Sequence, residues 1–560
     1  MVKGGIGMTS FRFRQLVTIF VAMVFYLTLF QAIPAHAKSE IVKTTMYSNG
    51  YRFSPPITIT TARFYGPQVK FKSGDSIDNN VWTKAYEAYC GIKLKSLFIS
   101  TDFNSFDKAV TSRIASDSLP DILPVYGSMF YRIADQGKAY NLKSMFDKYL
   151  DTSLKTMMQT YDGGRAYKAS YRNKMLAGIA SPPSKSPSML WIRQDWLDKY
   201  GLEWPKTITE ALNIAKTFCI KNPGAPTSKQ TYAFPLTQSL EEITGLANAY
   251  GAYRHIWIYD SKGGLMRSEV SPKWKTVLKL LSDMYEQGQL DPEFVLQHNS
   301  TINQGMINQQ FGMYFGSAGS PVSILENSLS KDPNARWKQG YLTDTTGKSA
   351  KMQVRTQIQS FYVVSKKSKY PEAVMFLANI YGDLANGIGA KYRKYNDFIA
   401  SDKRSYDSFW YPLVDMSYPK TNTKSMIANA IKTDDDSKLM GSQLNIFEKY
   451  NAWTQKKISS AWGMWAIFKP DGSYDTESKI LSNNLIVFDK GWGKDSPTWS
   501  VKGPELWWNS DIYFSKIIRG DISVEDGFSQ WLAYFKHNGG AIATAEMNKW
   551  WWKYGKAGFR

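Results

Sequence analysis

The chain has 560 residues, 43% of them hydrophobic and 15% aromatic, with a formal net charge of +21. The chain is longer than a single hydrophobic core usually supports, so we expect two or three packed units. Its hydrophobic content is ample to build them. The basic residues are spread along the chain instead of forming dense runs, which argues against nucleic-acid binding.

The N-terminus has the pattern of a secretory signal. Lys3, Arg12 and Arg14 precede an apolar run at Leu16–Phe30, and small residues before Lys38 complete a cleavage site at Pro34–Ala37. The run is shorter than the roughly 20 residues that a membrane-spanning helix needs. We therefore expect residues 1–37 to be removed. Without those three bases, the mature chain carries a net charge near +18.

Short strands and helices alternate after the signal, which is typical of an α/β protein. The expected elements in this part are a strand at Ile57–Ala62, a helix at Val81–Tyr89 ended by Gly91, a strand at Ile92–Ile99, a helix at Phe106–Ile114 and a strand at Leu119–Leu123. The loop Val125–Ser128 follows the last of these strands, and open α/β sheets bind ligands at such positions.

The polar segment Asn173–Pro183 is predicted to cross from one packed unit to the next. The elements expected beyond it are a strand at Met189–Arg193, a helix from Gln194, a helix with capping-box spacing at Thr207–Glu210, a helix opened by Ser271–Pro272, a strand crossing back at Gln357–Ser365, a helix at Ala373–Tyr381, and a helical tail broken at Gly539–Gly540. The segment Tyr392–Asn445 gives no clear pattern, apart from a solvated turn expected at Asp434–Asp436.

A search for catalytic motifs favours a binding module. The mature chain contains His255, His298 and His537 without metal-ligand spacing, and we expect all three to be surface or capping groups. No Gly-rich phosphate loop and no G-x-S-x-G elbow occurs. Paired carboxylates for glycoside cleavage remain an open alternative, since spacing does not reveal them. Cys90 and Cys219 continue apolar helical stripes, which favours two free thiols.

Several blocks together resemble one family. Ile114–Ile122 (IASDSLPDI) is similar to the pattern IASGDLPDI, from which Asp117 and Ser118 depart, and Ile192–Leu197 (IRQDWL) is similar to I-R-x-D-W-L. Further matching blocks lie at Met284–Phe294 (MYEQGQLDPEF), Phe311–Met313, Ile517–Asp521 and Gly539–Trp550. Over nearly all of its mature length, the chain resembles bacterial extracellular solute-binding proteins of family 1. The similar branch contains lipoprotein A-like and alginate-binding receptors.

The resemblance implies an α/β, two-lobed periplasmic-binding-protein-like fold of type II, with crossover hinge segments and a ligand cleft between the lobes. Its expected division is residues 38–177 in lobe 1, 178–356 in lobe 2, 357–400 back in lobe 1, and 401–560 shared between the lobes with a helical tail. It further implies a monomeric receptor of an ABC importer, without enzyme activity or cofactor, that delivers an oligosaccharide to a membrane permease. The positive charge favours acidic sugar units over neutral ones.

Two departures from the family pattern matter. Some relatives carry an acidic calcium loop, but the corresponding segment here, Lys221–Lys229, has no carboxylate, so we expect no metal there. Many relatives carry a lipid-linked cysteine at the mature N-terminus, whereas this chain has Ala37–Lys38, so we expect an exported protein without a lipid anchor. The membrane would then be contacted only through the permease.

The candidate ligand-binding residues are polar or aromatic groups in irregular segments near the expected cleft. They are Asp121, Tyr126, Ser186, Trp191, Tyr314, Ser317, Trp410, Tyr411, Trp462 and Trp465. Aromatic rings can hold the apolar faces of sugars while polar groups bind the hydroxyls. Two alternatives stay open: a secreted polysaccharide lyase or hydrolase, recognised by product formation without a permease, and a wall-associated adhesion protein, recognised by salt-sensitive binding to wall polymer without binding of soluble sugar.

The processing expectation can be tested directly. We expect the mature protein to begin at or near Lys38 and to carry no lipid, because the cleavage pattern is not followed by a cysteine. Intact-mass measurement of protein taken from the native cell envelope checks this. A retained N-terminus or a lipid adduct would contradict it.

Overall fold

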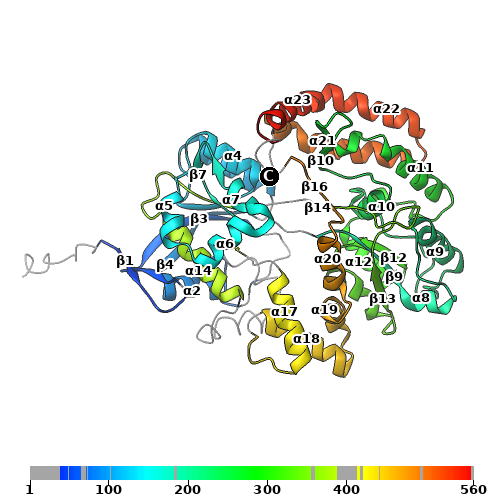
Figure 1. Ribbon diagram of the computed structural model, residues 1–560, viewed down its shortest axis with the longest axis horizontal. Coiled ribbons are helices and arrows are strands. Elements are labelled where there is room, and N and C mark those ends of the chain that lie inside the picture. The colour runs from blue at the N-terminus through cyan, green and yellow to red at the C-terminus, as the bar shows by residue number, and fades with distance from the viewer. Residues whose placement is uncertain are drawn as a thin grey trace, which may run out of the picture.

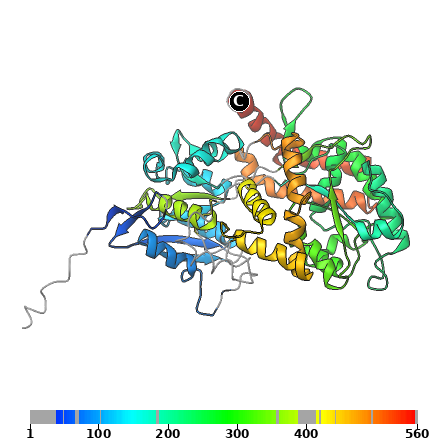
Figure 2. The same ribbon diagram turned by 60° about the horizontal axis from the view of Figure 1, so that its bottom comes forward.

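The computed structural model describes residues 38–47, 49–64, 71, 73–100, 103–181, 186–354, 360–386, 413–416, 420–439, 442–491 and 496–555. These residues form two lobes side by side (Figure 1), and the turned view separates them as well (Figure 2). The N-terminal strands and helices build lobe 1, drawn in blue and cyan, together with the later helix α14. In the described part of the chain, no helix combines the length and apolar character needed to cross a membrane.

Lobe 1 contains nine strands and seven α-helices among the described residues. The strands are β1 (Glu40–Lys43), β2 (Tyr51–Ser54), β3 (Ile57–Phe64), β4 (Ile92–Ser100), β5 (Ile122–Val125), β6 (Tyr171–Arg172), β7 (Met175–Leu176), β8 (Ile179–Ala180) and β15 (Phe361–Val364). The helices are α2 (Val81–Ala85), α3 (Phe103–Ala115), α4 (Gly127–Asp135), α5 (Lys143–Tyr149), α6 (Thr152–Thr160), α7 (Arg165–Ala169) and α14 (Ala373–Asn386).

Two groups of strands form the centre of lobe 1. β3 and β4 are parallel, while β15 runs antiparallel between β5 and β8. Asp121 joins the groups, because its carboxylate accepts hydrogen bonds from the backbone N–H and the hydroxyl of Thr60, at 2.9 and 2.5 Å. The predicted strands at residues 57–62 and 92–99 are confirmed. Gly91 ends the helical segment before β4 as predicted, in the left-handed conformation with φ +63°.

The segment predicted to leave lobe 1 at Asn173 instead stays inside it. Asn173 and Lys174 both have positive φ and close the tight β6–β7 hairpin, and the next strand, β8, pairs with β15. The N–H of Ser181 then donates to the carbonyl of Ser360 at 2.8 Å. The boundary expected after residue 177 is therefore too early, and lobe 1 continues to at least Ser181.

Lobe 2 carries the remaining strands and most of the C-terminal helices. The strands are β9 (Met189–Arg193), β10 (Trp257–Tyr259), β11 (Leu265–Arg267), β12 (Met313–Gly316), β13 (Trp337–Gly340), β14 (Met352–Val354) and β16 (Ile486–Phe488). The helices are α8 (Gln194–Lys199), α9 (Ile208–Lys221), α10 (Thr244–Ala249), α11 (Lys273–Glu286), α12 (Asn299–Ile307), α13 (Ser320–Ser323), α17 (Lys420–Thr433), α18 (Ser442–Lys456), α19 (Trp462–Phe468), α20 (Ser473–Ser482), α21 (Pro497–Ile518), α22 (Val524–Phe535) and α23 (Ala541–Trp550).

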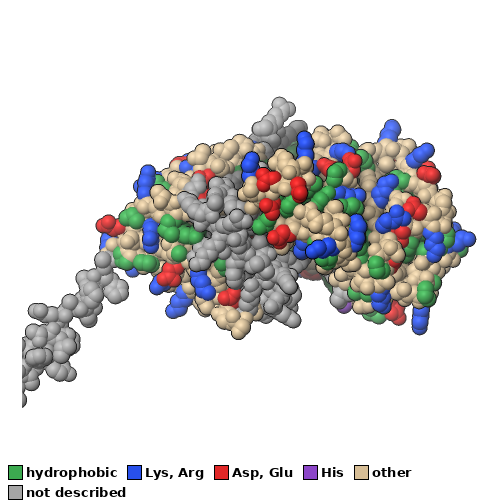
Figure 3. Space-filling view, turned by 90° about the horizontal axis from the view of Figure 1, so that it is seen from below, with side chains coloured by type: hydrophobic (Ala, Val, Ile, Leu, Met, Phe, Trp, Pro, Cys, Tyr) green, Lys and Arg blue, Asp and Glu red, His purple; other side chains and the backbone are tan. Residues whose placement is uncertain are grey.

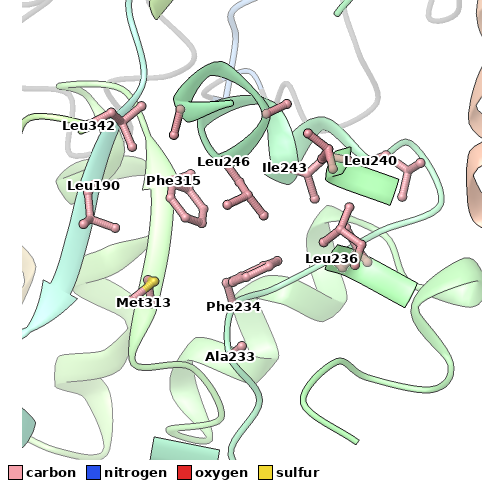
Figure 4. Close-up of a cluster of buried hydrophobic side chains, with 14 of the residues drawn as sticks. Leu190, Ala233, Phe234, Leu236, Leu240, Ile243, Leu246, Met313, Phe315 and Leu342 are labelled. Carbon is pink, nitrogen blue, oxygen red and sulfur yellow. The ribbon is translucent and has the colours of Figure 1, made fainter. Parts of the chain in front are cut away.

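The central sheet of lobe 2 places β9 between β12 and β13, antiparallel to both. Side chains alternate between the two faces of a strand, so Leu190, Met313 and Phe315 share one face. They join a buried cluster with Phe234, Leu246 and neighbouring apolar residues (Figure 4). The strand predicted at residues 189–193 is confirmed.

Local signals also predict several helix starts in lobe 2. α8 follows β9 at Gln194, and Thr207 caps α9 by accepting a hydrogen bond from the N–H of Glu210 at 3.1 Å. α11 begins at Lys273, one residue later than expected, with Pro272 as its N-cap. The tail is helical as predicted, with its break at Gly539, where φ is +103°.

A buried group of charges ties the C-terminal helix α21 to the body of lobe 2. Arg254 is 1% exposed, and its guanidinium donates to Asp511 of α21 at 2.7 Å. Its backbone N–H and carbonyl both bond the side-chain amide of Gln353 in β14, at 2.6 and 2.7 Å. Arg254 therefore connects β14 with the C-terminal helix through direct hydrogen bonds.

The prediction that all three histidines lie at the surface or cap helices is wrong for His255. Its side chain is 8% exposed and lies 3.6 to 3.8 Å from Glu241, Glu269 and Asp511. The ring stacks on Trp507, with centroids 5.2 Å apart. A buried imidazole is stable here because acidic groups and an aromatic face surround it. His298 does cap α12, and His537 is exposed.

The two cysteines are free thiols, as predicted. Burial raises the pKa of both thiols, Cys90 and Cys219, to about 12. Both thiols therefore remain protonated at neutral pH.

Glu326 is a half-buried carboxyl between two helical segments of lobe 2. It lies in the 3-10 turn Leu325–Ser330, next to Gly463 in the first turn of α19. Burial raises its pKa to about 7, against the opposing effects of Lys449 and the Gly463 N–H. Its Oε2 has no hydrogen-bond partner among the described residues.

The Arg254–Asp511 pair leads to a stability prediction. Replacing Asp511 with Ala should lower the free energy of unfolding by about 3–5 kcal/mol, because the Arg254 charge would stay buried without its partner. Asp283→Ala is the control, since it breaks the exposed Lys279–Asp283 pair and should cost less than about 1 kcal/mol. Urea unfolding followed by tryptophan fluorescence measures both. Equal effects of the two variants would contradict the prediction.

Glu326 leads to a prediction about pH. The folded state raises the pKa above the value in the unfolded chain, so folded protein binds more protons between about pH 4.5 and 7. This contribution to stability is fully present below the unfolded pKa and is lost as pH rises through about 7. The melting temperature of the wild type should therefore fall more between pH 5 and pH 8 than that of Glu326→Gln. Parallel melting profiles would rule this out.

Candidate functional site

In lobe 1, one edge of the β5–β15–β8 sheet carries the chain toward lobe 2. Phe361 pairs with both Val125 and Ala180, so the carboxyl ends of β5 and β8 lie beside the start of β15. Tyr126 follows β5 directly and is the N-cap residue of α4. The Tyr126 side chain is partly exposed. Burial of its remaining surface raises the pKa of the phenol, which therefore stays neutral. Tyr126 thus offers a ring and a hydroxyl at this edge.

In lobe 2, the corresponding edge of the central sheet receives the chain. Met189 begins β9 opposite Gly316, the last residue of β12, and Ser317 follows at once. Ser317 is partly exposed, and its hydroxyl accepts a hydrogen bond from the N–H of Gly319 at 3.3 Å. The polar loop after β12 therefore lies at the edge next to the crossing.

Tyr314 bends back along β12 toward that edge. A Cβ at position 316 would collide with the Tyr314 ring and with the Ser320 hydroxyl, so Gly316 leaves the space that the ring occupies. Burial, with a smaller effect of Glu242, raises the pKa of Tyr314 to about 12. The Tyr314 residue is partly exposed, while its neutral phenol is largely buried beside Ser320.

A second segment of lobe 2 supports this edge, and motif reasoning did not find it. The carboxylate of Glu242 accepts hydrogen bonds from the N–H and hydroxyl of Thr237, and burial raises the pKa of Glu242. Arg254 donates to the carbonyls of Ser239 and Leu240. No local sequence signal marks these residues, because they meet only through the fold.

The structure places the other candidates in different surroundings. Trp191 is 0% exposed and Trp462 is 2% exposed, both inside the core of lobe 2, so neither ring offers a free face. Asp121 is occupied in joining β3 to β5. Ser186 is exposed at the start of the chain in lobe 2. Trp410 and Tyr411 lie outside the described residues.

Trp465 lies in α19, which packs against α13, the helix that follows the Ser317 loop, with Gly463 next to Val322. The Trp465 ring packs against Trp453 of α18 at 5.9 Å, and the Lys469 ammonium lies 4.7 Å from its centroid. The structure therefore places Tyr314 and Ser317 at the edge of the lobe 2 sheet that receives the chain, and Tyr126 at the end of the lobe 1 sheet from which the chain crosses.

The two lobes also make a described contact near the crossings. The guanidinium of Arg165 in α7 lies 5.1 Å from the ring centroid of Phe488 in β16. β16 runs parallel to β14, the last strand before the chain returns to lobe 1. As for metals, no group of three or more His, Cys, Asp or Glu in the described ranges is placed to hold an ion.

Comparison with known proteins gives partial sequence matches. The fructooligosaccharide ABC transporter substrate-binding protein FusA of Streptococcus pneumoniae is 26% identical over 219 residues, which cover 36% of this chain and 40% of that protein. The polygalacturonan/rhamnogalacturonan-binding protein YtcQ of Bacillus subtilis is 23% identical over 238 residues, 40% of this chain and 44% of that protein. The matches span less than half of each relative.

Solved structures match over most of the chain. The alginate-binding protein AlgQ2, without calcium ion, aligns with a TM-score of 0.59 at 14% identity, covering 88% of this chain and 97% of that one. An extracellular solute-binding protein from Bifidobacterium longum subsp. infantis gives 0.56 at 14% identity, covering 91% and 99%. At such low identity the likeness concerns the fold, which is the two-lobed type II architecture predicted from the sequence.

A family model covers the part of the chain that contains both sheet edges. Residues 71–384, more than half of the chain, match the family described as bacterial extracellular solute-binding protein. Together with the two-lobed fold, this match shows that the chain belongs to the bacterial extracellular solute-binding proteins.

Proposed function

We propose that this protein is the receptor of an ABC importer and that it binds an oligosaccharide between its two lobes. The observation that carries the proposal is the position of Tyr126 on one lobe and of Tyr314 and Ser317 on the other, at the sheet edges where the chain crosses. Ligands of open α/β sheets bind at such strand ends. Neutral phenols and a hydroxyl suit sugar rings and their hydroxyl groups.

Family membership and the names of relatives support a carbohydrate. FusA is named for fructooligosaccharides, and YtcQ for polygalacturonan and rhamnogalacturonan. Between a neutral and an acidic sugar, the mature chain's net charge near +18 favours the acidic one, because a positive surface raises the local concentration of anionic ligands. We therefore place oligosaccharides with uronate units first and neutral ones second.

Delivery requires a partner and a change of shape. We propose that the bound receptor closes its lobes about the crossing segments and that the closed monomer docks on membrane permease subunits. Hinge closure around a ligand is the usual response of two-lobed binding proteins. The protein acts by binding, with no chemical step, in agreement with its membership in a solute-binding family.

Titration calorimetry and small-angle scattering test the proposal together. Uronate and neutral oligosaccharides of equal length are titrated at low and high salt, and the radius of gyration is measured with and without saturating ligand. We expect tighter binding of the uronate oligomer and a smaller radius when it is bound. Binding of neither sugar, with tight binding of a peptide or a metal complex, would refute the carbohydrate assignment.

Tyr126 gives this experiment a residue-level prediction. Tyr126→Ala should weaken oligosaccharide binding by about tenfold, since the loss of one aromatic contact costs on the order of 1–2 kcal/mol. Tyr534→Ala is the matched control, because Tyr534 lies in α22 with its hydroxyl on Glu505 and should leave affinity unchanged. Equal affinities of the two variants would remove Tyr126 from the site.

A further inference from the structure

Three lysine and three tryptophan side chains form a row on lobe 2. We define this Lys–Trp row by its members, which are Lys457, Trp453, Trp465, Lys469, Lys338 and Trp204. The Lys457 ammonium lies 5.3 Å from the centroid of Trp453, whose ring lies 5.9 Å from that of Trp465. The Lys457–Trp453 contact joins residues four apart in the chain, whereas the Trp453–Trp465 contact joins α18 to α19.

The other half of the row runs from α19 to β13. The Lys469 ammonium lies 4.7 Å from the Trp465 centroid, and that of Lys338 lies 5.1 Å from the Trp204 centroid. The strand that carries Lys338 lies beside the segment after Lys469, because the side-chain amide of Gln339 donates to the carbonyl of Asp471 at 2.7 Å. Burial, and after it the charge of Lys338, lowers the pKa of Lys469. Trp204, in turn, packs closely against Gly340 at the end of β13.

The row is accessible and positively charged. Lys457 and Lys338 are exposed, and the three rings are partly exposed. The charge of Asp471 opposes the lowering of the Lys469 pKa. The same carboxylate also pairs with Lys479 at 3.2 Å, so one acid is shared between two lysines and positive charge remains in excess. Figure 3 views the molecule from below, the side on which α17 and α18 lie in Figure 1, and shows basic and apolar side chains next to each other on the lobe at the right.

We propose that the Lys–Trp row is a second carbohydrate site, which binds a stretch of uronate polysaccharide on the surface of lobe 2. The tryptophan rings supply flat apolar faces that can pack on pyranose rings. The ammonium groups between them supply charge for the carboxylates of the sugar units. A polyphosphate without rings would use the lysines alone and leave the three tryptophans without a role. A single-stranded nucleic acid would use both kinds of group, but the basic residues are spread along this chain, so the combination favours an acidic sugar chain.

In the free protein, the lysine ammonium groups lie over the indole rings that a sugar would contact. An exposed cation–π contact is weak, about 0.5–1 kcal/mol, so a sugar ring can displace the ammonium group from the indole face. The long lysine side chain can then turn to meet a carboxylate of the same sugar chain. The free protein therefore holds each lysine ammonium group next to a ring, close to where a sugar carboxylate would bind.

All members of the row belong to lobe 2, whereas the proposed site between the lobes also uses Tyr126 of lobe 1. α18, α19, β13 and the loop before α9 all pack in lobe 2. Binding on the row therefore needs no lobe closure. It could hold the receptor on a long acidic polymer while shorter oligosaccharides enter the site between the lobes.

Affinity electrophoresis of the full-length mature chain tests the row with polygalacturonate as the probe. The variant Lys338→Gln/Lys457→Gln/Lys469→Gln keeps all three rings and removes their cations. Its control, Lys262→Gln/Lys279→Gln/Lys516→Gln, removes the same charge from exposed positions elsewhere on lobe 2. We expect roughly tenfold weaker retention for the first variant, as three exposed charge contacts together provide about one power of ten. The control should be retained like the wild type.

A second variant and a second readout complete the test. Trp453→Ala should also weaken retention, whereas Trp508→Ala, which removes an indole that is 51% exposed on α21, should not. Equal losses in both lysine variants would reveal a net-charge effect only and overturn the proposal, as would a wild type that polygalacturonate does not retard or that dextran retards equally. Scattering with a uronate trisaccharide reports lobe closure separately, so failure of the site between the lobes is distinguishable from failure of the row.

Discussion

The hydrogen bonds around Arg254 join three parts of lobe 2 into one rigid body. These parts are β14, the segment at Ser239 and the C-terminal helix α21. The Arg254 backbone bonds Gln353 of β14, its guanidinium reaches the carbonyl of Ser239, and the same group pairs with Asp511 of α21. A buried guanidinium is costly unless its donors are satisfied, so these contacts must be kept together. Any closing motion therefore has to move the sheet edge and the C-terminal helices as a unit.

Much of the fold could be predicted because its signals are local. The strand Met189–Arg193 is apolar in its first four residues, and the Thr207 cap acts within one turn, so both are visible in a short window of sequence. The hairpin at Asn173–Lys174 was missed for a physical reason. Its turn consists of two polar residues in the left-handed region, a pattern that also suits a linker.

The candidate site was harder to predict because exposure depends on contacts between distant segments. Tyr314 and Trp191 lie opposite each other on neighbouring strands, yet only Tyr314 reaches the edge, where Gly316 leaves room for its ring. The burial of Trp462 likewise depends on helices that pack over it. The Arg254–Asp511 pair joins residues separated by 257 positions, for which a single sequence contains no local signal.

The protonated state of the two thiols has a consequence for the redox chemistry of the folded chain. With a pKa of about 12, a thiol forms the reactive thiolate on the order of once in 10⁵ molecules at neutral pH. Disulfide exchange proceeds through the thiolate, so Cys90 and Cys219 are poor partners for each other, for neighbouring envelope proteins and for small oxidants. Once the chain is folded, both thiols are thus slow to exchange, whether the surroundings are reducing or oxidising.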